Sequence, residues 1–240
     1  MSRIVNKDFL YLKEYISEYN LKSLSKNEEL WNIYKSAHKN IYGIIALIAE
    51  IEKFILTCEE KKEKDELELE FDYLKECVSD LLSSLFISFH GAYKSAEFIL
   101  RSSIEMFLRG MYSIEVHSIC DEKNLYKIFE SIKSAPSIIG NENMKTHFDN
   151  VHQIYVELCK YAHTSSKIQM DELYALNLFP KYNVKSLSNL ISNLNKLIRN
   201  YIFMLCFRFR NEFHKIHFEN KQAILDCLSK GEKPIIMGEF

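Results

Sequence analysis

The stretch from Leu30 to Cys58, LWNIYKSAHKNIYGIIALIAEIEKFILTC, decides the fold class. Its apolar positions recur at alternating steps of four and three: Leu30, Tyr34, Ala37, Ile41, Ile44, Ile48, Ile51, Ile55 and Cys58. That spacing is typical of a long helix that buries one stripe lengthwise against another helix. We therefore expect a long helix here, packed against a second one.

The same rhythm returns after an acidic stretch. EEKKEKDELELE, residues 59–70, has almost nothing to bury, and we expect a solvated turn with frayed helix ends there. Apolar positions then recur at Phe71, Leu74, Val78, Leu81, Leu85, Ser88 and Ala92. The two arms predict an antiparallel helical hairpin over about 27–118, in which Gly91 is either a break or a bend.

The remaining chain carries shorter helical signals. A small amphipathic helix begins near Asp121, another helix ends near His163, and a final long helix runs from Ser186 to about Ser229. The tail after it is short, and we expect it to be peripheral. These signals predict one all-α domain over 1–240, a helical bundle of five to seven helices with its second helical part at about 121–230.

Composition supports a folded helical protein. The chain has 240 residues, and its 6 Gly and 3 Pro favour helices over a turn-rich β fold. A net charge of −2 argues against a generally basic nucleic-acid binder and leaves room for a local basic patch. The six cysteines are scattered without a C-x-x-C pair, which is typical of reduced cysteines in the cytoplasm. No apolar run approaches the roughly 20 residues that cross a bilayer, so we expect no membrane association.

A second stretch, FILRSSIEMFLRGMY from Phe98 to Tyr112, places charges on an otherwise apolar helix. Apolar residues fall on every side of it at about 100° per residue, which is typical of a central helix. Arg101, Glu105 and Arg109 follow at steps of four, and buried charges need partners. Two interpretations remain open. The three side chains satisfy one another, or a spare guanidinium holds a phosphate or a polar group from a facing helix.

Lys160 and His163, in LCKYAH, are candidate neighbours of that cluster, because His163 closes an otherwise apolar helix. The structural alternative for His163 is a helix cap or a dipole partner. Cys159 and His163, with His152 on the same stripe, form a weak metal pattern that lacks a carboxylate. The chain also has no P-loop, G-x-G-x-x-G, G-x-S-x-G or H-E-x-x-H motif. We therefore expect no metal and no cofactor.

The final helix carries a third constellation, FRFRNEFHKIHF from Phe207 to Phe218. Arg210, His214 and His217 are spaced i, i+4 and i+7, so a continuous helix would place them on one face within about 60°. An imidazole that titrates near neutral pH can take the proton of a 2′-hydroxyl, and a guanidinium beside it can stabilise a phosphodiester transition state. No metal is needed for this chemistry. The alternative is a solvated basic face.

An all-α bundle with an R-x4-6-H motif on a late helix resembles the HEPN superfamily, whose members are frequently metal-independent ribonucleases of bacterial toxin–antitoxin, abortive-infection and CRISPR systems. Arg210–Asn211 with His217 matches R-N-x5-H, and Arg208 with His214 matches R-x5-H. The resemblance implies that Arg210 binds phosphate, that His217 is the acid/base and that Asn211 orients one of them. It also implies a homodimer with one composite site. RSSIEMFLR and YVELCKYAH look, more loosely, like helical proteins found near phage-defence genes.

Together, these features predict a HEPN-like cytoplasmic protein that acts on RNA as a homodimer, in bacterial phage defence or as a toxin. The alternative is a non-catalytic helical module that binds a partner protein or an effector ligand. The two functions are separated by whether Arg210 and His217 converge on an open, positively charged cleft.

Overall fold

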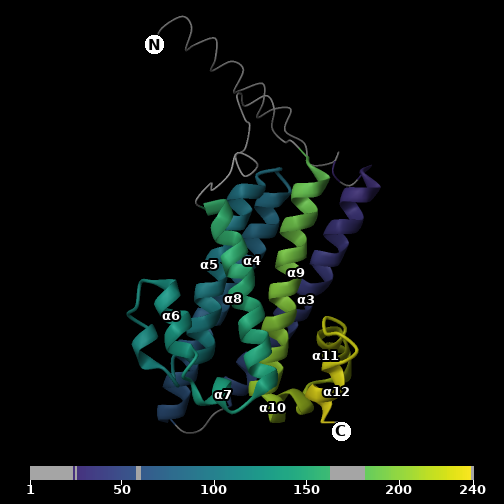
Figure 1. Cartoon of the computed structure of the whole chain (residues 1–240). Coiled ribbons are helices and arrows are strands. Elements are labelled where there is room, and N and C mark those ends of the chain that lie inside the picture. The colour runs from purple at the N-terminus through teal and green to yellow at the C-terminus, as the bar shows by residue number, and fades with distance from the viewer. Residues whose placement is uncertain (1–23, 25, 58–60, 163–181, 239–240) are drawn as a thin grey trace, which may run out of the picture.

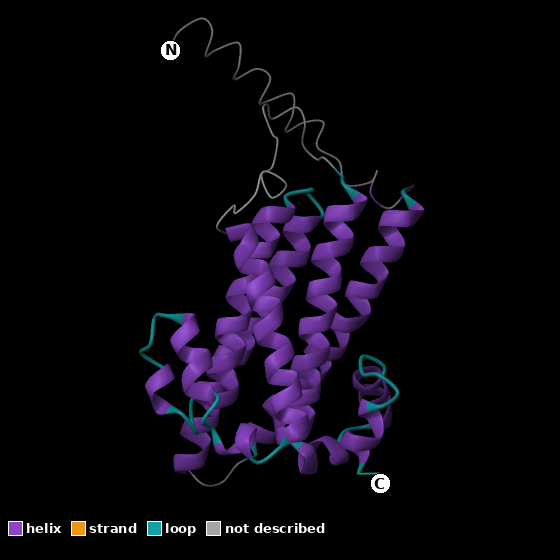
Figure 2. Cartoon of the chain, in the orientation of Figure 1, coloured by secondary structure: helices purple, strands orange, loops and turns teal. Residues whose placement is uncertain are grey.

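The computed structural model describes residue 24 and residues 26–57, 61–162 and 182–238, and within these ranges the chain is helical and forms no strand (Figure 2). Five long helices make up most of it: α3 (Glu28–Leu56), α4 (Lys61–Ser88), α5 (Tyr93–Tyr112), α8 (Glu142–Ala162) and α9 (Val184–Arg208). The short elements are η1 (His117–Ile119), α6 (Leu125–Ile132), α7 (Pro136–Ile139), α10 (Arg210–Lys215), α11 (Phe218–Leu225) and α12 (Glu232–Met237). The all-α fold class is confirmed.

The described ranges hold ten α-helices, so the expected five to seven are not confirmed. The long helices account for five, and the excess lies in short elements. α7 forms between the helix expected near Asp121 and the one expected to end near His163, α10 and α11 form where one continuous helix was expected, and α12 forms from the tail. Short helices of one or two turns carry too few periodic positions to be recognised from the sequence.

α3 follows the sequence pattern closely. Asn27 caps it by accepting a hydrogen bond from the Leu30 amide at 3.1 Å, and Glu28 and Glu29 complement the helix dipole in the first turn. The eight stripe positions from Leu30 to Ile55 are all buried, whereas Cys58 lies outside the described residues. The stripe packs on α9 and α4, which lie side by side with α3 in the bundle (Figure 1).

The acidic stretch does not form a turn in the part that is described. α4 begins at Lys61, because glutamate and lysine are good helix formers, and its side chains at Leu67 and Glu70 are buried. The expected second arm also differs, since α4 ends at Ser88 and the chain reverses at Gly91, where φ is +73°. The long hairpin over 27–118 is therefore not confirmed.

α5 returns along α4 as its principal neighbour. Ser84 Oγ donates to the Ala96 carbonyl at 2.9 Å near the reversal. At the other end the helices approach so closely that a β-carbon on Gly110 would lie 2.7 Å from Leu74 Cγ. Glycine is required at this crossing because any side chain would push the helices apart. α5 is thus a central helix, as the all-round apolar pattern predicts.

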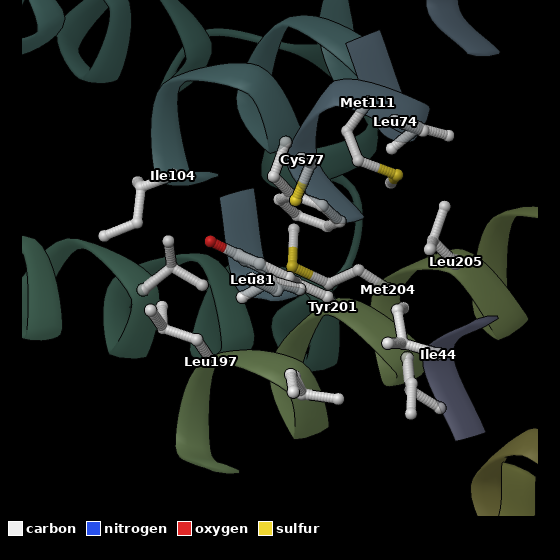
Figure 3. Close-up of a cluster of buried hydrophobic side chains, with 14 of the residues drawn as sticks. Ile44, Leu74, Cys77, Leu81, Ile104, Met111, Leu197, Tyr201, Met204 and Leu205 are labelled. Carbon is white, nitrogen blue, oxygen red and sulfur yellow. The ribbon is translucent and has the colours of Figure 1, made fainter. Parts of the chain in front are cut away.

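The centre of the bundle is a dense apolar cluster formed by α3, α4, α5 and α9. Figure 3 shows Tyr201 of α9 lying among Ile44, Leu81, Ile104 and Met204. Its ring stacks on the ring of Phe107 with a centroid separation of 3.7 Å. Burial of such large side chains removes the most apolar surface from water and is the main stabilising contribution to the fold.

The chain beyond α9 departs from the expected single helix from Ser186 to Ser229. Phe209 leaves the helical region at φ −97° and ψ 39°, and Ile216 is extended at ψ 141°. The tail packs back onto α9 through α12, where Ile236 is fully buried, so the tail is not peripheral. The separation into α9, α10, α11 and α12 decides where the candidate site residues lie.

One hydrophobic cluster includes buried residues from α3 through α12. The single domain over 1–240 stays a prediction, since residues 1–23 and 163–181 are outside the described ranges. A search of the described helices found none with the length and apolar character of a membrane span.

Candidate functional site

The Arg109 side chain is buried in the protein. Its side chain forms an ion pair with Glu105 at 2.6 Å, so one of the expected i,i+4 pairs on α5 is present. The guanidinium also donates to the carbonyls of Ile119, of Cys120 at 2.8 Å and of Glu122 at 2.6 Å. These bonds hold η1 and the following loop against α5. With its donors directed at protein oxygens, Arg109 has a structural role.

Arg101 turns away from Glu105 and faces α8. Its Nη2 donates to Tyr155 Oη and its Nε to Cys159 Sγ, both at 3.4 Å. The guanidinium also lies over the Tyr155 ring, 5.2 Å from the centroid. Within the described ranges no carboxylate forms an ion pair with Arg101, so the three charged residues do not form the expected closed set.

The expected neighbours of that cluster are only partly visible. Lys160 is exposed near the end of α8, and His163 lies outside the described residues. His152, a member of the weak metal pattern, packs against the Phe129 ring at 4.5 Å between centroids. Among the described side chains, no three His, Cys, Asp or Glu residues are grouped as metal ligands.

The break after α9 divides the Arg210 motif. Arg210, Asn211 and His214 belong to α10, whereas His217 is the N-cap residue of α11 in non-helical backbone, with ψ 143°. The expected single face that joins Arg210 with His217 is therefore wrong, because it required one continuous helix. Arg210 instead lies against the chain end, where a β-carbon on Gly238 would be 2.5 Å from its Nη2. Asn211, His214 and His217 are exposed.

Arg208, the arginine of the second motif match, is bonded to groups in the protein interior. It forms an ion pair with Glu70 of α4, which is 2% exposed, and donates to the Met111 carbonyl at 2.5 Å. Burial raises the pKa of Glu70, although the charge of Arg208 and its hydrogen bond oppose that effect. The Arg208–His214 match is thus not supported by side-chain geometry.

A polar cluster that the sequence did not indicate joins α8, α9 and α12. Arg199 donates three hydrogen bonds of 2.7–2.9 Å to Glu232. Two run from Nε to the two carboxylate oxygens, and one runs from Nη2 to Oε1. His147 Nδ1 is 2.7 Å from Asn200 Oδ1, and its Nε2 is 3.6 Å from Glu232 Oε1. Asn200 Nδ2 donates to the Lys196 carbonyl, which leaves Oδ1 to accept from His147.

The electrostatics of this cluster favour a charged Glu232 and a neutral His147. Burial alone would raise the pKa of Glu232, but the hydrogen bonds from Arg199 and the Ser229 amide hold that pKa below its ordinary value. Burial lowers the pKa of His147, and the Asn200 hydrogen bond and the Glu232 charge offset only part of that effect. The cluster therefore pairs two charges and keeps the imidazole uncharged near neutral pH.

An open pocket of about 250 Å³ adjoins the cluster between α8 and α9, referred to below as the α8–α9 pocket. Its lining consists of polar and charged residues around one aliphatic side chain: Asn150, Gln153, Ile154, Glu157, Lys196, Arg199, Asn200 and Glu232. His147 does not line it, so the imidazole is a supporting group in this arrangement. None of the predicted site residues lines this pocket.

The outer side of α3 carries a second stripe, shifted by one residue from the buried one. Its eight positions, again at steps of four and three, are all exposed: Trp31, Lys35, His38, Tyr42, Ile45, Ala49, Glu52 and Leu56. The large apolar members are 40–65% exposed. We name this face the outer stripe of α3. Four large exposed apolar side chains on one helix face, with charged and polar positions between them, form a candidate interaction surface.

Comparisons with known proteins assign no family. No protein-family description, no curated protein and no solved structure matches the chain. The outer stripe was readable from the sequence as a second 4–3 repeat from Trp31 to Leu56. His147 and Glu232 carry no such signal, because their partners lie 53 and 33 residues away.

Proposed function

We propose that this protein is a non-catalytic helical binding module that docks through the outer stripe of α3, and that its partner is a second copy of the chain. The observation that carries the proposal is the self-complementarity of the stripe. A cytoplasmic location is part of the proposal and is supported by the free cysteines of the described part of the chain.

An antiparallel pairing of two α3 helices has its two-fold axis between Tyr42 and Ile45. Tyr42 then faces Ile45 of the partner, and Trp31 faces Leu56 at each end. The same register brings Lys35 opposite Glu52. This is the one facing pair in which both residues are charged, and their charges are opposite. Both residues are exposed, and neither takes part in an ion pair within the described ranges. Charge and apolar pattern therefore agree on one register.

The size of the stripe suits a stable contact. From Trp31 to Leu56 it runs for 25 residue steps along a continuous helix, or roughly 38 Å at the ~1.5 Å rise of an α-helix. α11 packs against another side of α3, as the Ala223 carbonyl beside Gly43 shows, and no element among the described residues covers the outer stripe. Two copies would bury Trp31, Tyr42, Ile45 and Leu56, and large apolar residues contribute most of the free energy of such contacts.

The test is a charge swap measured by sedimentation equilibrium. Lys35→Glu places like charges together at two symmetry-related points and should weaken the dimer about tenfold, which corresponds to about 1.4 kcal/mol. Glu52→Lys should do the same, and the double variant Lys35→Glu/Glu52→Lys should regain wild-type affinity. Lys145→Glu, an exposed position on α8, is the matched control and should leave the dimer unchanged.

Trp31 supplies a second readout, because it is the only tryptophan of the chain. Its emission should shift to shorter wavelength as the protein concentration rises through the dimerisation range. A monomer at all concentrations would contradict the proposal. A dimer that ignores both single charge reversals would place the interface elsewhere.

The second candidate function is the metal-independent ribonuclease of the HEPN-like interpretation, with RNA as substrate. It is favoured by one observation: Arg210 and His214 lie one turn apart on α10, and neither is held in an ion pair within the described part of the structure. The arrangement is weaker than a formed site, because His217 is on another element and none of these residues lines the α8–α9 pocket.

Induced expression in bacteria tests this candidate. If the chain is a ribonuclease, the wild type should arrest growth and cleave cellular RNA, and a folded Arg210→Ala/His217→Ala variant should do neither. His214→Ala tests the α10 residue separately. Intact RNA with the wild type would remove the support for this candidate and leave the binding module.

A further inference from the structure

A second open pocket, of about 340 Å³, lies where the ends of α5 and α9 meet α7 and the start of α8. We name it the α7 pocket. Apolar residues and four polar or charged ones share its lining: Met111, Glu115, Pro136, Ser137, Gly140, Asn141, Met144, Phe207 and Arg208. An apolar pocket with a small number of convergent polar groups is the usual form of a small-molecule site.

One of these polar groups is without a partner. Ser137 Oγ is shielded from water and makes no hydrogen bond within the described part of the protein. Leaving a buried hydroxyl unsatisfied destabilises the folded state. The fold does not need this hydroxyl, because the Ser137 amide already holds the loop by donating to Glu115 Oε2 at 3.2 Å. The hydroxyl is shielded although the pocket is open, so it does not face the pocket, and we assign it no bond to a ligand.

Two further groups offer complementary hydrogen bonding. Arg208 uses one N–H group to reach Met111 and one to reach Glu70, and a guanidinium has five, so donors remain. Glu115 Oε2 accepts from Ser137, and Oε1 remains as an acceptor. The pocket thus presents donors from Arg208 and an acceptor from Glu115 around Phe207, Met111 and Met144.

The charge balance restricts the ligand. Glu70 already neutralises Arg208, and Glu115 adds a carboxylate to the lining, so an anion would meet two carboxylates for one guanidinium. The aromatic ring of Phe207 and the thioethers of the two methionines suit a flat, polarisable body.

We propose that the α7 pocket binds an uncharged heteroaromatic molecule of nucleobase size, with an acceptor directed at Arg208 and a donor directed at Glu115. This site is independent of the outer stripe of α3, since the two share no residue.

The test uses adenosine, guanosine, cytidine and uridine as probes in titration calorimetry and thermal unfolding of the full chain. At least one nucleoside should bind and raise the Tm. Its 5′-monophosphate should bind no more tightly than the nucleoside, because the phosphate gains no cation in the pocket. A monophosphate that binds while its nucleoside does not would overturn the proposal in favour of an anion site.

Two conservative variants separate binding from folding. Ser137→Ala removes an unsatisfied hydroxyl that does not face the pocket, so it should unfold at the same Tm as the wild type or higher and should leave binding unchanged. Glu115→Gln can still accept from the Ser137 amide and should weaken binding at least tenfold. Glu142→Gln, an exposed glutamate near the pocket that does not line it, is the control. No binding by any of the four nucleosides, or binding that Glu115→Gln leaves unchanged, overturns the proposal.

Discussion

Two arginine–glutamate pairs in this protein differ in what surrounds them. Arg109 and Glu105 lie one turn apart on α5, and the remaining donors of Arg109 are taken by main-chain carbonyls in the interior. Arg199 and Glu232 come from α9 and α12, and the Arg199 side chain stays 47% exposed beside the α8–α9 pocket. In the first pair every donor of the arginine is bonded to a protein oxygen, whereas in the second pair the arginine is accessible to solvent and lines a pocket.

The difference shows what a buried charge can do. A guanidinium that is fully satisfied by the protein holds chain segments together and has nothing to offer a ligand. One that keeps solvent access can exchange partners at small cost. In the sequence, charge on an apolar helix indicates a site on α5, yet of the two paired arginines the more accessible one is Arg199 on α9. Burial, more than charge, separates the two roles.

The largest effect should come from Arg109→Met. It leaves Glu105 without its ion-pair partner and removes the donor from three carbonyls, so the free energy of unfolding should fall by about 3–5 kcal/mol. Urea denaturation followed by circular dichroism measures it. Lys160→Met, at an exposed position on α8, should change the same quantity very little. A loss below about 1 kcal/mol for Arg109→Met would erase the distinction between the two pairs.

An intermediate effect should appear in the pH dependence of stability, through His147. Its folded pKa lies below the ordinary value of 6.5, so in the window between the two values the unfolded chain binds a proton that the folded chain does not. The contribution of the neutral His147 to the free energy of unfolding is therefore fully present above about pH 6.5, and it is lost as the pH falls through that window. Glu232, Arg199 and Asn200 face the ring.

His147→Gln removes this titration while keeping a donor for Asn200. From pH 7.5 to pH 5 the Tm of the wild type should fall more than that of the variant. Glu232, whose pKa is depressed below 4.5, contributes stability that is lost only at more acidic pH, in both proteins. Parallel Tm curves between pH 7.5 and 5 would show that the imidazole is not held neutral.

The smallest effect should come from Arg101→Ala. Its two hydrogen bonds are long, at 3.4 Å, and the side chain is half-buried, so the loss should be about 1 kcal/mol or less. Thermal unfolding of Arg101→Ala, Arg109→Met and the wild type under the same conditions compares the two losses of stability directly. A loss as large as that of Arg109→Met would make Arg101 a structural residue of the same kind.

Much of the fold was predictable because helices leave a local periodic signal. The 4–3 spacing from Leu30 to Ile55 and the apolar positions from Leu187 to Leu205 identify α3 and α9, and all of these stripe positions are buried. Helix ends were less predictable. The break at Phe209 and the reversal at Gly91 depend on where the chain packs, and the sequence pattern continues through both.

The amino-acid sequence by itself determined the helical class, the buried stripes and the Arg109–Glu105 pair, since each depends on residues a few positions apart. Only the tertiary structure decided that Arg208 belongs to Glu70, that His217 is separated from Arg210, and that His147 and Glu232 meet beside Arg199. Those contacts join residues far apart in the chain. Their existence depends on how whole helices pack, which no local spacing records.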